Sequence, residues 1–118
     1  MKAEAALRDL VAEFDRCIEE LARARERAEE LLAQRHSGHT WTEIVSGEAR
    51  PLVVERITTV LGSLARAGSA WRREQALALQ GENVSINRIA AMFGVTRQRI
   101  SALLREREEA VPVPVDQA

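Results

Sequence analysis

Residues 89–105 read IAAMFGVTRQRISALLR and place Thr, Arg, Gln and Arg in succession at the start of a helical pattern. Guanidinium and amide groups donate hydrogen bonds to anionic partners. Residues 69–107 hold seven basic and three acidic side chains, a charge of +4, although the whole chain carries −1. By the same count residues 1–35 carry −2, residues 36–68 are neutral and residues 108–118 carry −3. The positive charge therefore lies with this stretch, as binding to a polyanion requires.

Other kinds of chemistry find no support in the sequence. It holds no Ser–His–acid grouping and no Gly-rich loop that would cradle a phosphate. The single cysteine, Cys17, has no Cys or His neighbour, and His36 and His39 only flank a Ser-Gly turn. We therefore expect no metal site, no cofactor and no enzyme activity.

Two short helices with a tight turn between them are predicted to hold the basic stretch in place. Ser85 and Thr96 are suited to cap the two helices, and Gly94 is suited to the corner because glycine tolerates a positive φ. Ala90 is small enough for a close crossing of the helices. The inner faces are expected to be Ile89, Ala90 and Phe93 on the first helix and Ile100, Leu103 and Leu104 on the second.

Residues 86–105 resemble the helix-turn-helix family of bacterial DNA-binding transcriptional regulators. Seven positions carry the match: Ile89, Ala90, Phe93, Gly94, Val95, Ile100 and Leu103. With the preceding stretch WRREQALALQGENVS as a supporting helix, the likeness covers about residues 69–107. It is similar to the trihelical domains of phage-repressor-type regulators, sigma-factor region 4 and serine recombinases. The Ala/Arg/Leu-rich composition resembles that of small regulators from actinobacteria.

The resemblance implies that a recognition helix, residues 97–107, enters the major groove of double-stranded DNA with its first turn leading. Arg97, Gln98 and Ala102 would read base edges: guanine, adenine and the thymine methyl group, respectively. Contacts to phosphates would come from a second set: Ser85, Arg88, Thr96, Arg99, Ser101 and Arg105. Arg72 and Arg73 are weaker candidates, since a solvated helix end explains them equally well.

The N-terminal segment, residues 1–36, repeats apolar residues every seven positions without Gly or Pro between Lys2 and Arg35. This pattern predicts one long, coiled-coil-like helix whose seam pairs two chains. The expected dimerisation residues are Leu7, Leu10, Phe14, Cys17, Ile18, Leu21 and Leu31. The alternative is an intramolecular hairpin with the helix after Pro51, and the two arrangements can share the seam. Cys17 is expected to be buried and inert, although paired Cys17 thiols in a parallel dimer would form a redox sensor.

Residues 37–68 are expected to form short connecting helices that pack on the long one. Gly38 should end the first helix, and T-W-T-E from Thr40 is a capping box with Trp41, Ile44 and Val45 turned inward. Pro51 suits the first position of the next helix, and ARAGS (65–69) predicts a break. Ser69 would then cap a helix over 70–80 that ends at Gly81, within a DNA-binding domain over 69–108. Residues 109–118 are predicted to be a flexible tail.

The sequence thus predicts an all-α protein: a long N-terminal helix, short connecting helices and a C-terminal trihelical helix-turn-helix domain. Without a long apolar run or a signal peptide, we expect a cytoplasmic protein at the nucleoid. The predicted function is a homodimeric, sequence-specific transcriptional regulator. Two alternatives remain open: a coiled-coil adaptor that binds RNA polymerase or a sigma factor, and a weakly specific architectural protein of the nucleoid.

Overall fold

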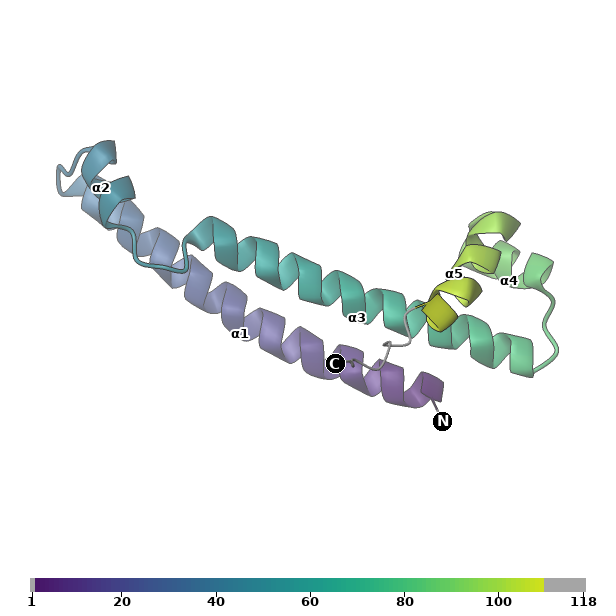
Figure 1. The fold of residues 1–118 in the computed structure, drawn as a ribbon. Coiled ribbons are helices and arrows are strands. Elements are labelled where there is room, and N and C mark those ends of the chain that lie inside the picture. The colour runs from purple at the N-terminus through teal and green to yellow at the C-terminus, as the bar shows by residue number, and fades with distance from the viewer. Residues whose placement is uncertain (1, 110–118) are drawn as a thin grey trace, which may run out of the picture. The chain divides into compact units, whose positions relative to one another are not determined.

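The computed structural model describes residues 2–109, with side chains through residue 106. The described chain forms five helices and no strand: α1 (Lys2–His36), α2 (Trp41–Gly47), α3 (Val53–Gly81), α4 (Ile86–Phe93) and α5 (Arg97–Glu109) (Figure 1). The predicted all-α class and the long N-terminal helix are confirmed. The predicted tail falls, from residue 110 onward, outside the described residues. None of the described helices has the length and apolar character needed to cross a membrane.

The chain divides into two compact units. The first, which we call the hairpin unit, is residues 8–67, and the second, the C-terminal unit, joins the start of α1 up to Leu7 with the described residues from Gly68 onward. Both α1 and α3 contribute to both units.

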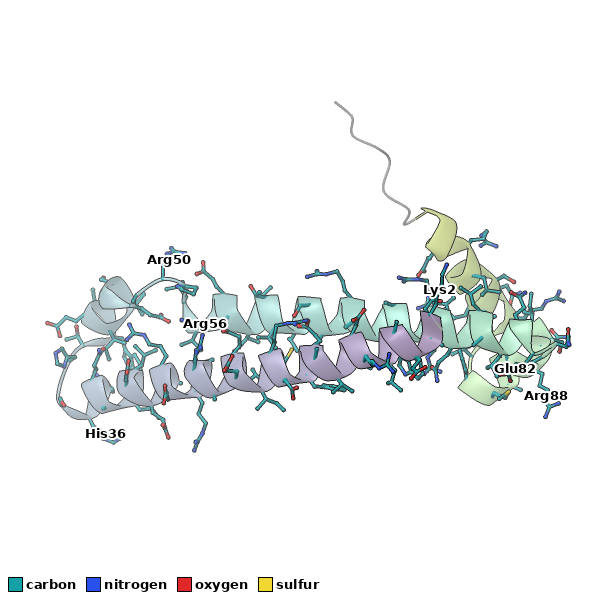
Figure 2. The ribbon with its side chains drawn as sticks, turned by 90° about the horizontal axis from the view of Figure 1, so that it is seen from below. Lys2, His36, Arg50, Arg56, Glu82 and Arg88 are labelled. Atoms are coloured by element: carbon teal, nitrogen blue, oxygen red, sulfur yellow. The ribbon has the colours of Figure 1, made fainter. Side chains whose placement is uncertain are left out.

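In the hairpin unit, α1 and α3 run antiparallel. The Ser63 hydroxyl donates to the Glu13 carboxylate at 2.7 Å. The guanidinium of Arg56, which is labelled in Figure 2, lies 3.1 Å from the Glu20 carboxylate. Between these contacts the Cys17 Sγ lies 4.0 Å from the Val60 carbonyl oxygen. The intramolecular hairpin, the alternative left open by the sequence, is therefore present in this unit.

Local capping signals set the ends of α1 and α2. Gly38 takes a φ of +98°, and the N–H of His39 donates to the Gln34 carbonyl at 3.1 Å, which ends α1 as predicted. Thr40 and Glu43 form the predicted capping box: the Thr40 hydroxyl accepts from the Glu43 N–H at 3.1 Å, and the Glu43 carboxylate accepts from the Thr40 N–H at 2.8 Å. These bonds explain why a helix of only seven residues forms here.

The prediction that three side chains of α2 turn inward is wrong for two of them. Ile44 is buried, but Trp41 and Val45 are both more than half exposed. A helix of two turns that packs on one neighbour buries only a narrow stripe. The Trp41 ring instead lies under the Arg35 guanidinium, 5.1 Å from it, in a cation–π contact.

Two predictions about α3 are also wrong. The helix begins at Val53 rather than Pro51, because the Glu48 and Glu55 carboxylates accept hydrogen bonds from the N–H groups of Val53 and Leu52, both at 2.8 Å. It then continues through residues 65–69, where a break was expected. A single Gly inside a helix costs only about 1 kcal/mol relative to Ala, which a 29-residue helix tolerates.

The end of α3 at Gly81 is confirmed, but Gly81 itself does not take the left-handed conformation. Asn83 does so, with a φ of +68°, and the N–H of Val84 donates to the Leu79 carbonyl at 3.0 Å. Asparagine is, after glycine, the residue most often found at such a position. The chain then turns into α4.

The hydrophobic core of the C-terminal unit joins the last part of α3 to α4 and α5. Its buried residues are Ala76, Ile89, Ala90, Ile100 and Leu103. Leu79, Val84, Ile86, Phe93 and Leu104 are partly buried around them. Because this cluster draws on all three helices, it fixes α5 by its inner face and leaves its other faces available.

Candidate nucleic-acid interface

The corner between α4 and α5 is built by a glycine in the left-handed conformation. Gly94 has a φ of +71°, and the N–H of Val95 donates to the Ala90 carbonyl at 3.0 Å. A Cβ at Gly94 would meet no atom within 4 Å. The glycine is therefore needed for its backbone conformation and not for space, as the sequence predicted.

Capping and core packing together fix the start of α5. The Thr96 hydroxyl accepts from the Arg99 N–H at 3.1 Å, and Ser85 caps α4 in the same way through the Arg88 N–H at 3.2 Å. Ile100 is fully buried and Leu103 nearly so. Their burial orients α5 so that Arg97, Gln98 and Arg105 face solvent.

Four polar side chains gather on the exposed side of α5. They line a shallow hollow of about 410 Å³: Arg97, Gln98, Ser101 and Arg105. Arg97, Gln98 and Arg105 are exposed, while Ser101 and the neighbouring Ala102 are partly buried. Two of the three predicted base-reading residues thus share one surface, and Ala102 lies within the same two turns of the helix.

The residues predicted to contact phosphates differ in their exposure and in the hydrogen bonds and ion pairs that they already make. Arg88 at the start of α4 is exposed (Figure 2), and Arg99 is 57% exposed, with its guanidinium 3.7 Å from the Glu106 carboxylate. The hydroxyl oxygens of Ser85 and Thr96 accept the capping bonds, and each O–H remains able to donate to a further acceptor. Ser85, Arg88 and Thr96 thus lie at the starts of α4 and α5, whereas the exposed Arg105 lies about two turns further along α5.

The two weaker arginine candidates have structural roles on α3. The Arg72 guanidinium lies 4.2 Å above the Phe93 ring, a cation–π contact that ties α3 to α4. Arg73 has a side chain only 21% exposed and lies 3.9 Å from the Glu106 carboxylate. The reading of these residues as a backbone clamp is therefore weakened.

Sequence reasoning missed Glu106 as part of this region. Its carboxylate lies within 4 Å of both Arg73 and Arg99 and reduces the positive charge on that side of α5. Residues 99 and 106 are seven positions apart, beyond the three- or four-residue spacing that predicts an ion pair on a helix, so the sequence carried no clear signal for the pair. The long-range contact with Arg73 had no local signal.

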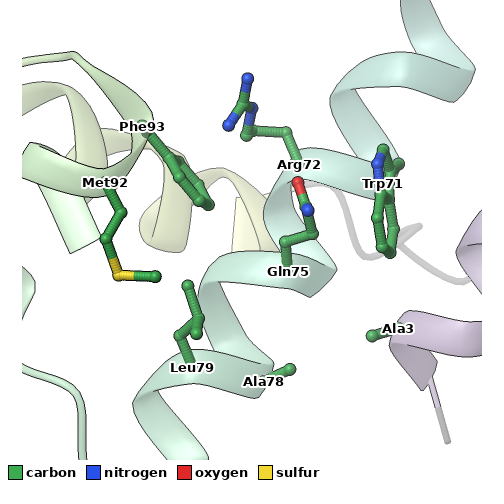
Figure 3. Close-up of a pocket in the computed structure, with 8 residues that line it drawn as sticks. All are labelled: Ala3, Trp71, Arg72, Gln75, Ala78, Leu79, Met92 and Phe93. Carbon is green, nitrogen blue, oxygen red and sulfur yellow. The ribbon is translucent and has the colours of Figure 1, made fainter.

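A second hollow lies between α3, α4 and the first residues of α1, and it belongs wholly to the C-terminal unit (Figure 3). Its volume is about 420 Å³, and its walls include Trp71 and Leu79 of α3 and Met92 and Phe93 of α4. Trp71 is partly buried here, whereas Met92 is exposed. The Trp71 ring is therefore part of the wall of this hollow.

The predicted dimerisation seam of α1 divides into two sides. Cys17 is buried against α3, and Leu10 and Leu31 are partly buried, so Cys17 packs within the chain rather than between two chains. Burial, assisted by the nearby Glu13 carboxylate, raises the pKa of the Cys17 thiol. The remaining seam residues are exposed: Leu7, Phe14, Ile18 and Leu21.

Within the described residues no three side chains of His, Cys, Asp or Glu gather in a way that could hold a metal ion. Comparisons with protein-family models, with curated proteins and with solved structures found no match to the chain. The function is therefore argued from the residues and geometry of the C-terminal unit.

Proposed function

We propose that the chain is a sequence-specific regulator of transcription that binds double-stranded DNA through a helix-turn-helix formed by α4 and α5. The single observation that carries the proposal is the two-sided character of α5. Ile100 and Leu103 anchor one side in the core, while Arg97, Gln98 and Arg105 project from another side around one hollow. A helix that is rigidly held by one face and offers multiple donors on another is what reading base edges requires.

The dimensions of α5 suit the major groove. An α-helix with its side chains is about 10–12 Å across, and the groove of B-DNA is ~12 Å wide. Arg97 and Gln98 lie in the first turn of α5, the part that leads into the groove in this class of motif. Arg97 would donate two hydrogen bonds to guanine, Gln98 would pair with adenine, and Ala102 would contact a thymine methyl group.

Charge on the C-terminal unit supports the same partner. Between residues 69 and 106 there are six basic and three acidic side chains, a balance of +3. Exposed Arg88 and Arg99, together with the capped starts of α4 and α5, would hold phosphates on either side of the groove. Attraction to the phosphates gives affinity without sequence preference, so specificity is left to the groove-facing side of α5.

Selection of bound DNA from a random pool tests this proposal. We expect enrichment of one short motif that contains guanine next to adenine, the bases that Arg97 and Gln98 suit. Binding without enrichment would instead indicate an architectural protein of the nucleoid. Failure to retain DNA even at low salt would overturn the proposal and favour the adaptor that docks RNA polymerase or a sigma factor.

One recognition helix reads only a few base pairs, so a regulator of this kind gains discrimination when two copies bind neighbouring half-sites. We therefore include a homodimer in the proposal.

A further inference from the structure

The hairpin unit buries few side chains and leaves several large apolar side chains exposed. Its buried residues are Cys17, Ala24, Ile44 and Val60, and the clustered hydrophobic core of the described chain lies in the other unit. Eight larger apolar side chains of α1 and α3 in this unit are between 40% and 69% exposed, and six of them lie on one side of the hairpin. We call these six the apolar face: Phe14, Ile18, Leu21, Val54, Ile57 and Leu61.

The contacts between α1 and α3 show that the six lie on one side of the hairpin. Glu13, Cys17 and Glu20 of α1 contact α3, and the exposed apolar residues of α1 follow each of them by one position. On α3, Ile57 and Leu61 follow Arg56 and Val60 in the same way. One step along a helix is a rotation of about 100°.

In two antiparallel helices that face each other, this rotation leads to the same side of the pair. Seen from one end, the rotation is clockwise on one helix and anticlockwise on the other, because their directions are opposite. The residues one position before the contacts lie on the other side, and they are small or polar: Ala12, Arg16, Glu19, Glu55 and Thr59. The hairpin therefore has one apolar and one polar face.

We propose that two copies of the chain pair through the apolar face into an antiparallel four-helix bundle, with α1 of each copy lying against α3 of the other. The inference goes beyond the proposed function and does not depend on DNA binding. It assigns pairing to both helices of the hairpin rather than to the α1 seam alone.

The extent of the apolar face fits a second copy. The six side chains leave about 600 Å² exposed per chain, so a pair that covered them completely would bury ~1,200 Å², the lower end of the range for stable interfaces. Their spacings of three and four residues on both helices are those that interlock in helical bundles. A hairpin with the same spacing on both helices complements its own copy after a two-fold rotation.

The residues at the edges of the apolar face favour a dimer in which α1 lies against α3 of the other copy and not against its α1. Outside the apolar residues, α1 carries the exposed carboxylate of Asp15, whereas α3 carries the uncharged Thr58 and Ala65. When α1 of one copy lies against α3 of the other, Asp15 faces the uncharged edge of α3, so the two Asp15 carboxylates do not meet. All neighbouring helices in the bundle are then antiparallel, as in up-down bundles with short loops.

The mass of the full chain in solution, measured by light scattering without DNA, tests the pairing. We expect a dimer of the 13.1 kDa chain, and we expect Ile18→Glu or Leu61→Glu to weaken pairing on the order of 100-fold, because each buries an unpaired charge. Ala12→Glu is the matched control, since it adds the same charge to the exposed polar face of α1. It should leave the mass unchanged, and circular dichroism should show all variants helical.

A mixture of two variants tests the arrangement even where a single variant folds poorly. The hairpin contacts join residues whose numbers add to 76 or 77, so Ile18 lies level with residues 58–59 of α3, and Ile57 is the nearest residue of the apolar face on that helix. Ile18→Glu chains mixed with Ile57→Lys chains should form a mixed dimer that neither variant forms alone. A monomeric parent chain at ~100 µM, loss of pairing in Ala12→Glu, or no mixed dimer would each overturn the proposal.

Discussion

Alanine placed at Gly94 and at Gly68 should change the stability of the chain in opposite directions. At both positions a Cβ would meet no atom within 4 Å, so neither substitution creates a clash. The two glycines differ in backbone conformation: Gly94 has a φ of +71° in the α4–α5 corner, and Gly68 lies inside α3. The pair therefore separates backbone strain from packing.

The magnitudes follow from the backbone alone. An L-residue in the left-handed conformation costs roughly 1–2 kcal/mol, and the reduced freedom of the unfolded chain returns about 0.4–1 kcal/mol, so Gly94→Ala should lose about 1 kcal/mol. Gly68→Ala should gain about 0.8–1 kcal/mol from helix propensity. Gly94→Asn should lose less than Gly94→Ala, because asparagine tolerates this conformation.

Urea unfolding followed by circular dichroism measures both effects. With a slope of about 1–3 kcal/mol per M, the two alanine variants should shift the midpoint in opposite directions by ~0.3–1 M. If Gly94→Ala is neutral or stabilising, the corner does not depend on the left-handed glycine. If Gly68→Ala is destabilising, α3 is not a regular helix at residue 68.

Three further predictions concern the core, the thiol and the pH dependence. Ile100→Ala should lose about 2–5 kcal/mol of unfolding free energy in urea, because the side chain is fully buried, and a loss below 1 kcal/mol would contradict the core assignment. Cys17 should react slowly with a thiol reagent at neutral pH and rapidly in urea, since burial raises its pKa; equally fast reaction in both would refute its burial. The hydrogen bond from the Thr40 N–H lowers the pKa of Glu43, and the hydrogen bond from Arg16 lowers the pKa of Glu13. The stability that the two carboxylates contribute is therefore fully present above about pH 4.3, the ordinary pKa of Glu, and is lost as the pH falls through their lower folded pKa values. Urea midpoints should fall across that range, and Glu43→Gln should make the fall shallower; an unchanged slope would rule out the capping carboxylate as a cause.

Local signals in the sequence predicted several helix ends and the corner. Gly38 and Gly94 take positive φ values as expected, and Thr40, Ser85 and Thr96 cap their helices. These features depend on hydrogen bonds between residues a few positions apart. They can be read from the sequence because the partners lie in the same short segment.

Features that depend on distant contacts could not be predicted. The heptad pattern of α1 did not show that Cys17 would face Val60 within the chain while Ile18 stayed exposed. Glu106 lies beside Arg73 only because α5 packs on α3. The continuity of α3 through Gly68 reflects the length of the whole helix rather than the local composition.

The most direct test of the central claim is the base preference of Arg97→Ala, measured by fluorescence anisotropy on the selected DNA site and on sites with single base changes at several salt concentrations. Arg97→Ala should lose about 1–3 kcal/mol of discrimination at one base position, whereas Arg88→Ala should weaken binding to all sites and reduce the salt slope by about 1. Arg66→Ala, an exposed arginine of the hairpin unit, serves as the control and should change neither. Equal weakening of Arg97→Ala on every sequence would show that Arg97 holds only phosphate and would contradict the role of α5 in reading bases.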